Sequence, residues 1–273
     1  MDNRSAIFLN IGGCLLSEEA NVSSKYYQSL AWISSYIKNA NMGMETCPNI
    51  RFCSGRNIPF IEAISLVLGR PDASWVIIEN GAGLYNLRTK EFSYFPGITA
   101  ETKKTFDWLR QKAVPQILED FPFLTLWPGD IFSITFNRKT DSKIYTEDIR
   151  RNLAKSKLLK KLIAKKLIRI ICFRNSISIV PPRINKGTAI DFLAEKEEID
   201  LRQSLAIGDS KRDILFLNKV KFVGCPSNAS DSCHKFVKEK KGSGRISRFP
   251  HAMGVVDIIC YFTGIEPPDF LKN

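Results

Sequence analysis

Short apolar runs alternate with longer stretches of helical periodicity in the first part of the chain. Residues 6–9 and 75–78 are apolar runs of strand length, residues 50–53 are apolar apart from Arg51, and each segment ends at a polar or glycine-containing turn. Between them, residues 25–39 and 60–68 carry apolar side chains at helical spacing. Strands that alternate with helices and end in such turns predict a parallel sheet covered by helices.

The middle of the chain has a different pattern. A helix is predicted at 101–118 and a half-exposed strand at 131–137, and strands at 167–173 and 177–180 are joined by a hairpin turn at 174–176. This order predicts an α+β unit with a mostly antiparallel sheet, placed between two halves of the parallel domain. The α/β rhythm then returns, with elements predicted at 187–195, 204–207, 213–217, 221–223, 230–240 and 253–262.

The composition is that of a globular protein with a sizeable core, since 44% of the 273 residues are hydrophobic. No apolar run approaches the roughly 18 residues of a membrane helix, and residues 1–10 lack the pattern of a signal peptide. Seven cysteines without a Cys-x-x-Cys pair favour reduced thiols over a zinc site or disulfides. We therefore expect a soluble, cytoplasmic protein that does not associate with a membrane.

Much of the net charge of +12 lies in one segment. Residues 150–169 hold nine Lys or Arg and no acid, a pattern that attracts nucleic acid or phosphate. Leucine and isoleucine recur there at helical spacing, so the alternative is one amphipathic helix with a solvated basic face. The segment lacks interleaved aromatic residues that would stack on bases. The sequence thus favours the amphipathic helix and argues against nucleic acid as a partner.

Two aspartates four residues apart follow the apolar run at 204–207, in the motif Gly208-Asp209-Ser210-Lys211-Arg212-Asp213. Ligands of open parallel sheets bind outside the carboxyl ends of the strands, so both carboxylates are expected to face a site there. Carboxylate oxygens suit a hard cation. The alternative is that Asp209 or Ser210 only caps the following helix, and this motif alone does not decide between the two.

Two further motifs have a chemistry suited to phosphate. Asn185-Lys186-Gly187 opens a predicted helix, where the lysine can hold a phosphate oxygen as a point charge. Ser54-Gly55-Arg56 follows the second apolar run, where a hydroxyl and backbone N–H groups can form a phosphate seat. Taken singly, the first also fits an ordinary surface lysine and the second a plain turn.

Together these motifs resemble haloacid dehalogenase-type (HAD) phosphatases of the Cof-type subfamily, which includes sucrose-phosphate and mannosyl-phosphoglycerate phosphatases. The resemblance implies that Ser54 and Gly55 bind phosphate, that Lys186 stabilises its charge, and that Asp209 and Asp213 hold magnesium. It spans nearly the whole chain, and residues 79–82, 225–229 and 254–262 support it. The implied fold is an α/β, Rossmann-like core of residues 1–85 and 181–273 with an inserted α+β cap of residues 86–180.

The first motif departs from the family pattern. The family has Asp-x-Asp-Gly-Thr-Leu or Asp-x-Asp-Gly-Cys-Leu after the first strand, whereas residues 10–15 read Asn-Ile-Gly-Gly-Cys-Leu. Asn10 occupies the position of the nucleophile, and an amide is a poor nucleophile. Gly12 occupies the position of the general acid and base and has no side chain for that role, a loss typically worth about 10²–10⁴-fold in rate. The sequence predicts a catalytically impaired protein.

The implied Mg²⁺ site is weakened for the same reason. In the family pattern the cation takes oxygens from the first aspartate, from the backbone carbonyl at the second position and from the later aspartates. Asn10 offers only a neutral amide oxygen and Gly12 only its carbonyl, so only Asp209 clearly brings a negative ligand. A second hypothesis is that the guanidinium of Arg212 partly replaces the cation.

Three functions remain open from the sequence. The first is a pseudoenzyme that binds a small phosphorylated metabolite of the sugar-phosphate class, or a partner protein. The second is an active, magnesium-dependent phosphomonoester hydrolase in which Asn10 is a rescued or deliberately substituted nucleophile. The third is nucleic-acid binding through the basic segment 150–169, which predicts an affinity that falls steeply with salt.

Overall fold

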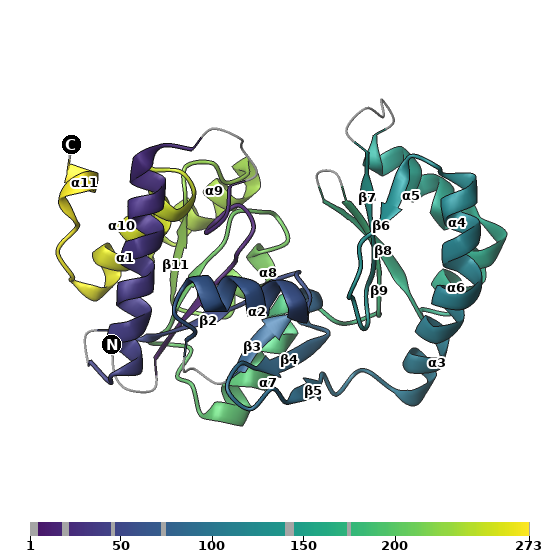
Figure 1. Cartoon of the computed structure of the whole chain (residues 1–273), viewed down its shortest axis with the longest axis horizontal. Helices are drawn as coiled ribbons and strands as arrows, with labels where there is room; N and C mark the ends of the chain where they lie inside the picture. The colour runs from purple at the N-terminus through teal and green to yellow at the C-terminus, as the bar shows by residue number, and fades with distance from the viewer. Residues whose placement is uncertain are drawn as a thin grey trace. The chain divides into compact units, whose positions relative to one another are not determined.

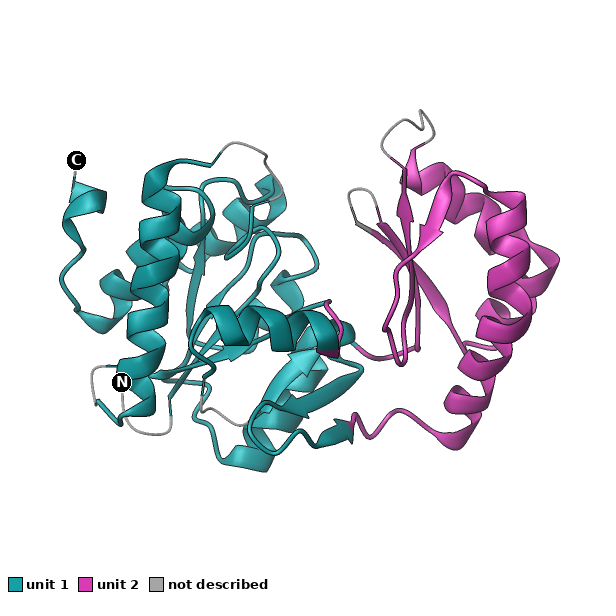
Figure 2. Ribbon diagram, viewed as in Figure 1, with its two compact units in different colours: residues 1–55, 59–93, 185–273 teal, residues 56–58, 94–184 magenta. Residues whose placement is uncertain are grey.

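The computed structural model forms two compact units (Figure 2). The boundaries of these units differ by a few residues from those of the predicted domains. Residues 92–94 form a strand of the three-stranded sheet, most of which belongs to unit 1. The carbonyl of Ile184 accepts a hydrogen bond from Arg169 of unit 2. The structure describes residues 5–17, 22–44, 47–71, 75–139, 145–173 and 176–272. Unit 1 comprises Met1–Gly55, Pro59–Ser93 and Asn185–Asn273, and unit 2 comprises Arg56–Ile58 and Tyr94–Ile184.

Unit 1 is built on the predicted parallel sheet (Figure 1). Its five strands follow the order β12-β11-β10-β1-β2, and all neighbours are parallel. The strands β1 and β10 are buried along their whole length, as expected for a sheet covered on both faces. The bounds are β1 (Ala6–Leu9), β2 (Asn49–Phe52), β10 (Leu205–Ile207), β11 (Phe222–Cys225) and β12 (Gly244–Ile246).

Helices cover both faces of this sheet. The long helices α1 (Ser24–Asn41) and α10 (His251–Thr263) pack along each other on one face (Figure 1). The other face is covered by α7 (Lys186–Glu197), α8 (Ile214–Leu217) and α9 (Asp231–Glu239). Two shorter helices complete the unit, α2 (Ile58–Val67) and α11 (Asp269–Lys272). Among the described residues, no helix combines the length and apolar character needed to cross a membrane.

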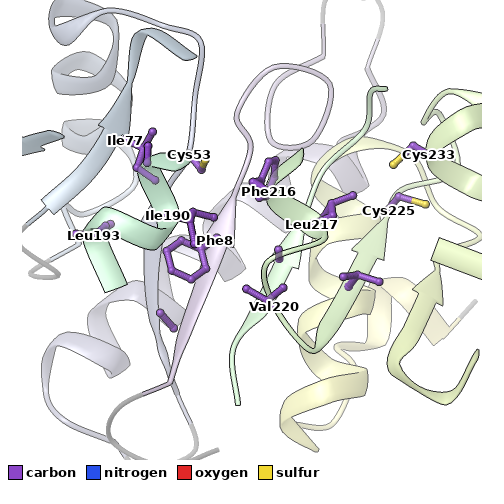
Figure 3. Close-up of a cluster of buried hydrophobic side chains, with 14 of the residues drawn as sticks. Phe8, Cys53, Ile77, Ile190, Leu193, Phe216, Leu217, Val220, Cys225 and Cys233 are labelled. Carbon is purple, nitrogen blue, oxygen red and sulfur yellow. The ribbon is translucent and has the colours of Figure 1, made fainter. Parts of the chain in front are cut away.

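A core of buried apolar side chains lies between α7, α8 and α9 and the parallel sheet (Figure 3). Phe8 of β1 and Phe216 of α8 are fully buried in it, together with Ile190 and Leu193 of α7. Burying large apolar side chains stabilises a domain by about 1.5–3 kcal/mol each. This packing therefore fixes α7 and α8, whose first turns carry the site, against the central strand.

The strand predicted at 75–78 forms, but its expected place in the parallel sheet is wrong. β3 (Trp75–Ile78) lies beside β2, where one parallel bridge joins Cys53 and Ile77 and the guanidinium of Arg51 donates to the Trp75 carbonyl. It pairs antiparallel with β4 (Gly83–Asn86), next to β5 (Phe92–Tyr94), in a separate three-stranded sheet. The cause is the short helix η1 (Glu79–Gly81), whose left-handed backbone turns the chain straight back.

Unit 2 is an antiparallel sheet with helices on one face, as predicted for the middle of the chain (Figure 1). The order is β6-β7-β9-β8, and Ile134, Phe136, Ile177 and Ile179 alternate into the buried face. The predicted helix 101–118 consists of α3 (Ala100–Trp108), a π-helical turn (Leu109–Ala113) and α4 (Val114–Asp120). The strands are β6 (Leu124–Leu126), β7 (Ile134–Arg138), β8 (Arg169–Phe173) and β9 (Ser176–Val180).

The basic segment forms two helices, so the expectation of one continuous helix is wrong. α5 (Thr146–Lys155) ends at Ser156, whose extended backbone breaks the helix and whose hydroxyl accepts from the amide of Leu159. α6 (Lys157–Ala164) follows directly. Leu153 and Leu159 are buried, so the predicted amphipathic character holds in both helices. Most of the predicted hairpin turn at 174–176 lies outside the described residues.

Candidate functional site

Polar side chains gather where three neighbouring strands of the parallel sheet end. Asn10 follows β1, Ser54 lies just beyond β2 and Asp209 just beyond β10. β1 lies between β2 and β10 and is parallel to both, so these strand ends share one edge of the sheet. Lys186 is the first residue of α7, and Asp213 immediately precedes α8. The structure thus brings the residues predicted from four separate motifs to one edge.

The position of Lys186 is set by the residue before it. The side-chain oxygen of Asn185 accepts from the amides of Gly187 at 2.8 Å and Thr188 at 3.1 Å. The hydroxyl of Thr188 in turn lies 3.3 Å from the amide of Asn185, which completes a capping box. This cap begins α7 at Lys186 and directs the chain so that the lysine is buried rather than exposed.

The amide of Asn10 lies at the centre of the site. Its nitrogen, Nδ2, donates to the Gly12 carbonyl and to Asp209 Oδ1, both at 2.8 Å, and to Asp213 Oδ2 at 3.3 Å. Its oxygen, Oδ1, accepts from Lys186 Nζ at 2.9 Å. Carboxylates only accept and an ammonium only donates, so these partners determine which way the amide points.

Lys186 and Asp213 form a buried ion pair beside this amide. Lys186 Nζ lies 2.7 Å from Asp213 Oδ1, and the two residues are 7% and 1% exposed. Asp213 Oδ2 also accepts from the hydroxyl of Ser210 at 2.8 Å and from the amides of Ser210 and Asp209 at 3.0 and 3.1 Å. The helix that follows, α8, receives no capping bond from a side chain. The carboxylate of Asp213 is thus bound to Lys186 and Ser210, and Ser210 is a partner that the motif did not reveal.

The two aspartates respond oppositely to this environment. Burial, together with the negative charge of Asp213, raises the pKa of Asp209 to about 7. Burial also works to raise the pKa of Asp213, but the charge and hydrogen bond of Lys186 and the donors from Ser210 outweigh it and hold that pKa below its ordinary value. Asp213 is therefore the ionised partner of Lys186, and Asp209 is the carboxyl that retains a proton near neutral pH.

The raised pKa of Asp209 predicts a specific effect on stability. Between its ordinary value of 3.8 and about 7, native Asp209 holds a proton that the unfolded chain has lost, so its contribution is complete below 3.8 and disappears as the pH rises through 7. Asp209→Asn is therefore expected to flatten the pH dependence of the free energy of unfolding in this window. Urea unfolding of both proteins across the window measures this, and an identical slope would contradict the assignment.

The turn after β1 has room at one glycine and none at the next. A Cβ on Gly12 would meet no atom within 4 Å. Gly13 has a φ of +80°, and a Cβ there would collide with the carboxylate of Asp209, so this position requires glycine. The carbonyl of Gly13 accepts from Asn228 Nδ2 at 2.8 Å and lies 3.2 Å from His251 Nδ1. His251 is buried at the start of α10 and, with Asn228, steadies this turn, a role that the sequence did not indicate.

Ser54 and Gly55 form a tight turn at the same edge. The amide of Ser54 donates to Ile77 and its carbonyl accepts from the amide of Asn80 at 3.1 Å. Gly55 approaches the Asn80 side chain so closely that a Cβ would lie 2.8 Å from its Oδ1. Just before Ser54, burial raises the pKa of Cys53 to about 12 while the charge of Lys186 opposes that rise. The turn is therefore within the electrostatic reach of Lys186.

Cys14, which follows the first turn, is not an activated thiol. It is fully buried, and its Sγ lies 4.0 Å from Asp209 Oδ1. Burial and the negative charge of Asp209 raise its pKa well above the ordinary value, whereas a nucleophilic cysteine needs a lowered one. The other cysteines are also free thiols, and only Cys172 among them is not buried.

The donor set of this site does not fit a divalent cation. Within the described ranges, no three His, Cys, Asp or Glu side chains come together as a metal cluster. The Gly12 carbonyl and the Asp209 carboxylate, both expected as ligands, instead accept from the Asn10 amide. The Asn10 oxygen, the third expected ligand, is bound to Lys186. The assignment of Asn10 as a metal ligand is therefore not supported by the direction in which its amide points.

Comparisons with known proteins agree with this geometry. Residues 128–243 match the family model described as haloacid dehalogenase-like hydrolase, a segment that includes Lys186, Asp209 and Asp213 but not the first motif. No curated protein sequence matches the chain. Residues 128–243 are therefore similar to haloacid dehalogenase-like hydrolases, and the resemblance inferred from the motifs is confirmed.

Solved structures show the same fold at low sequence identity. A Thermoplasma acidophilum protein is 18% identical with a TM-score of 0.65, covering 94% of this chain and 97% of its own. The sucrose-phosphatase of Synechocystis, solved with sucrose and phosphate, is 15% identical with a TM-score of 0.65, covering 96% and 98%. A haloacid dehalogenase-like hydrolase from Bacteroides thetaiotaomicron is 15% identical with a TM-score of 0.65, covering 93% and 98%. At these identities the likeness shows the fold.

Proposed function

We propose that this chain is a catalytically impaired HAD-phosphatase-like protein that binds a small phosphorylated metabolite. The observation that carries the proposal is the end of β1, where Asn10 and Gly12 place an amide and a bare backbone beside an intact lysine and aspartate pair. A phosphoryl group needs a nucleophile to accept it, and the Asn10 nitrogen is held between acceptors with no lone pair to offer.

The site also lacks a general acid. Protonation of the leaving oxygen requires a carboxyl at the position of Gly12, and the Asp209 carboxyl is already bound to Asn10. Asp213 accepts hydrogen bonds on both of its oxygens and is fully engaged with Lys186 and Ser210. Hydrolysis therefore lacks both of its reacting groups, while the turn of Ser54 and Gly55 and the charge of Lys186 remain for binding.

The ligand class follows from these remaining groups. Backbone amides and a hydroxyl at a strand end suit phosphate oxygens, and a lysine stabilises their charge. The Synechocystis protein of the same fold was solved with sucrose and phosphate, which supports a sugar phosphate as the ligand.

A panel of sugar phosphates tests this proposal in two assays. We expect no phosphate release above background with Mg²⁺, and we expect at least one member to raise the melting temperature of the wild-type protein. Ser54→Ala should weaken that binding by roughly 10- to 150-fold, because one hydrogen bond to a charged group contributes about 1.5–3 kcal/mol net. Ser230→Ala, in which an exposed serine is altered, is the matched control.

Two outcomes would contradict the proposal. Turnover well above background that depends on Mg²⁺ would favour the active hydrolase instead. If no sugar phosphate binds, or if Ser54→Ala and Ser230→Ala bind equally well, the turn of Ser54 and Gly55 does not bind phosphate.

A further inference from the structure

Two sets of atoms make opposite demands on residue 10. On one side, Lys186 Nζ has only hydrogens to offer and needs an oxygen, which Asn10 Oδ1 supplies at 2.9 Å. On the other side, the Gly12 carbonyl, Asp209 Oδ1 and Asp213 Oδ2 are all acceptors and need a hydrogen-bond donor. Asn10 Nδ2 supplies it at 2.8, 2.8 and 3.3 Å.

An amide can meet both demands only in this orientation. Turning the side chain so that its oxygen faced the three acceptors would place Nδ2 against Lys186, with two donors facing each other. The Asp209 and Asp213 carboxylates would then face the Asn10 oxygen with no hydrogen atom between the oxygens. Since Asn10 is 7% exposed and Asp213 1% exposed, water has little room to repair such a loss. A carboxylate at position 10 would face no such conflict, because it has one oxygen for the lysine and another for a cation.

We infer that the Asn10 amide nitrogen takes the place of a divalent cation, so that this site is complete without metal. The N–H group joins a backbone carbonyl to two carboxylates, which is the set of atoms that a cation would otherwise hold together. A cation could enter only if the amide released these acceptors and its oxygen left Lys186.

The charges agree with this assignment. In the pattern that the resemblance implies, four carboxylates face one lysine and one divalent cation, which leaves one net negative charge. Here two carboxylates, Asp209 and Asp213, face Lys186 alone, which leaves the same net charge when both carboxylates are ionised. Losing the two acids of the first motif therefore removes the need for two positive charges as well. The inference concerns the cation alone and does not depend on which metabolite binds.

Metal binding by the purified full-length protein tests the inference. Mn²⁺ binding, followed by electron paramagnetic resonance with Mg²⁺ competition, should be weak or absent in the wild type. Asn10→Asp should bind Mn²⁺ at least about 10- to 100-fold more tightly, the range by which ligand environments commonly alter metal affinity. Gln28→Glu makes the same change of charge at an exposed position of α1 and should bind no better than the wild type.

The wild-type protein alone provides a second readout if Asn10→Asp does not fold. The side-chain NH₂ resonances of Asn10 should be protected from solvent exchange and should not move on adding Mg²⁺, because both hydrogens are already bound. Tight Mn²⁺ binding by the wild type that Asp209→Asn abolishes would overturn the inference. Equal absence of binding in the wild type and in folded Asn10→Asp would also overturn it, because the amide would then not be what replaces the cation.

Discussion

Replacing Asn10 and Gly12 together by aspartate should produce a magnesium-dependent phosphatase, whereas we expect no phosphate release from the wild-type protein. The Asn10→Asp change would provide a carboxylate nucleophile with one oxygen for Lys186, which already donates to this position. The Gly12→Asp change would provide the missing general acid, and a Cβ at this position meets no atom within 4 Å. The remaining parts of the site, Asp209, Asp213 and the turn at Ser54, are already at the same sheet edge.

The size of the effect distinguishes the two substitutions. General acid catalysis typically contributes about 10²–10⁴-fold in rate, so the double variant should exceed Asn10→Asp alone by roughly that factor. Gly12→Asp alone should stay at background, since an acid without a nucleophile has no reaction to assist. The rates of two groups that act together do not multiply, so all three variants must be measured.

Phosphate release from a sugar-phosphate panel, with and without Mg²⁺, provides the measurement. Asn10→Asp with Gly12→Ala fills the same space without an acid and is the matched control. A double variant that folds, binds Mn²⁺ and still releases no phosphate would show that the lost carboxylates are not the only reason for inactivity.

Replacing Lys186 by methionine should cost about 3–5 kcal/mol of unfolding free energy. The change keeps most of the side-chain volume but leaves the carboxylate of Asp213 buried without its cation, and an uncompensated buried charge is strongly destabilising. The amide oxygen of Asn10 loses its donor in the same variant. Urea unfolding monitored by circular dichroism measures the loss.

Two comparisons show whether the loss comes from the buried charge. Adding Asp213→Asn to Lys186→Met removes that charge and should recover part of the stability. Lys219→Met breaks a lysine–aspartate pair with Asp191 that is exposed, and it should cost less than about 1 kcal/mol. Similar losses for Lys186→Met and Lys219→Met would contradict the view that the pair at the site is energetically special.

The sequence by itself predicted the elements and their order over most of the chain. The apolar runs of β1 and β10 are continuous because both faces of these strands are buried. The polar motifs that follow each run could be assigned to one sheet edge because parallel strands end on the same side. The residues of the site, including Lys186 and Asp209, were therefore available from the pattern of strands and turns.

The pattern of apolar and polar residues does not reveal which strands pair with each other or where a helix breaks. The run at β3 looks like any other buried strand, and only the left-handed turn from Glu79 to Gly81 sends the chain back to form a separate antiparallel sheet. The break between α5 and α6 depends on the backbone of Ser156, which helical periodicity does not reveal. Local preferences are weak compared with tertiary contacts, which is why these two expectations were wrong.

At the site, the sequence determined which chemical groups are absent, and the tertiary structure decided what the remaining ones do. Residue 10 is an amide and residue 12 has no side chain, and this suffices to predict the loss of a nucleophile and an acid. Only the folded chain shows that the Asn10 nitrogen faces the carboxylates and its oxygen faces Lys186. That orientation depends on donors and acceptors more than 170 positions away along the chain, which only folding brings within hydrogen-bonding distance.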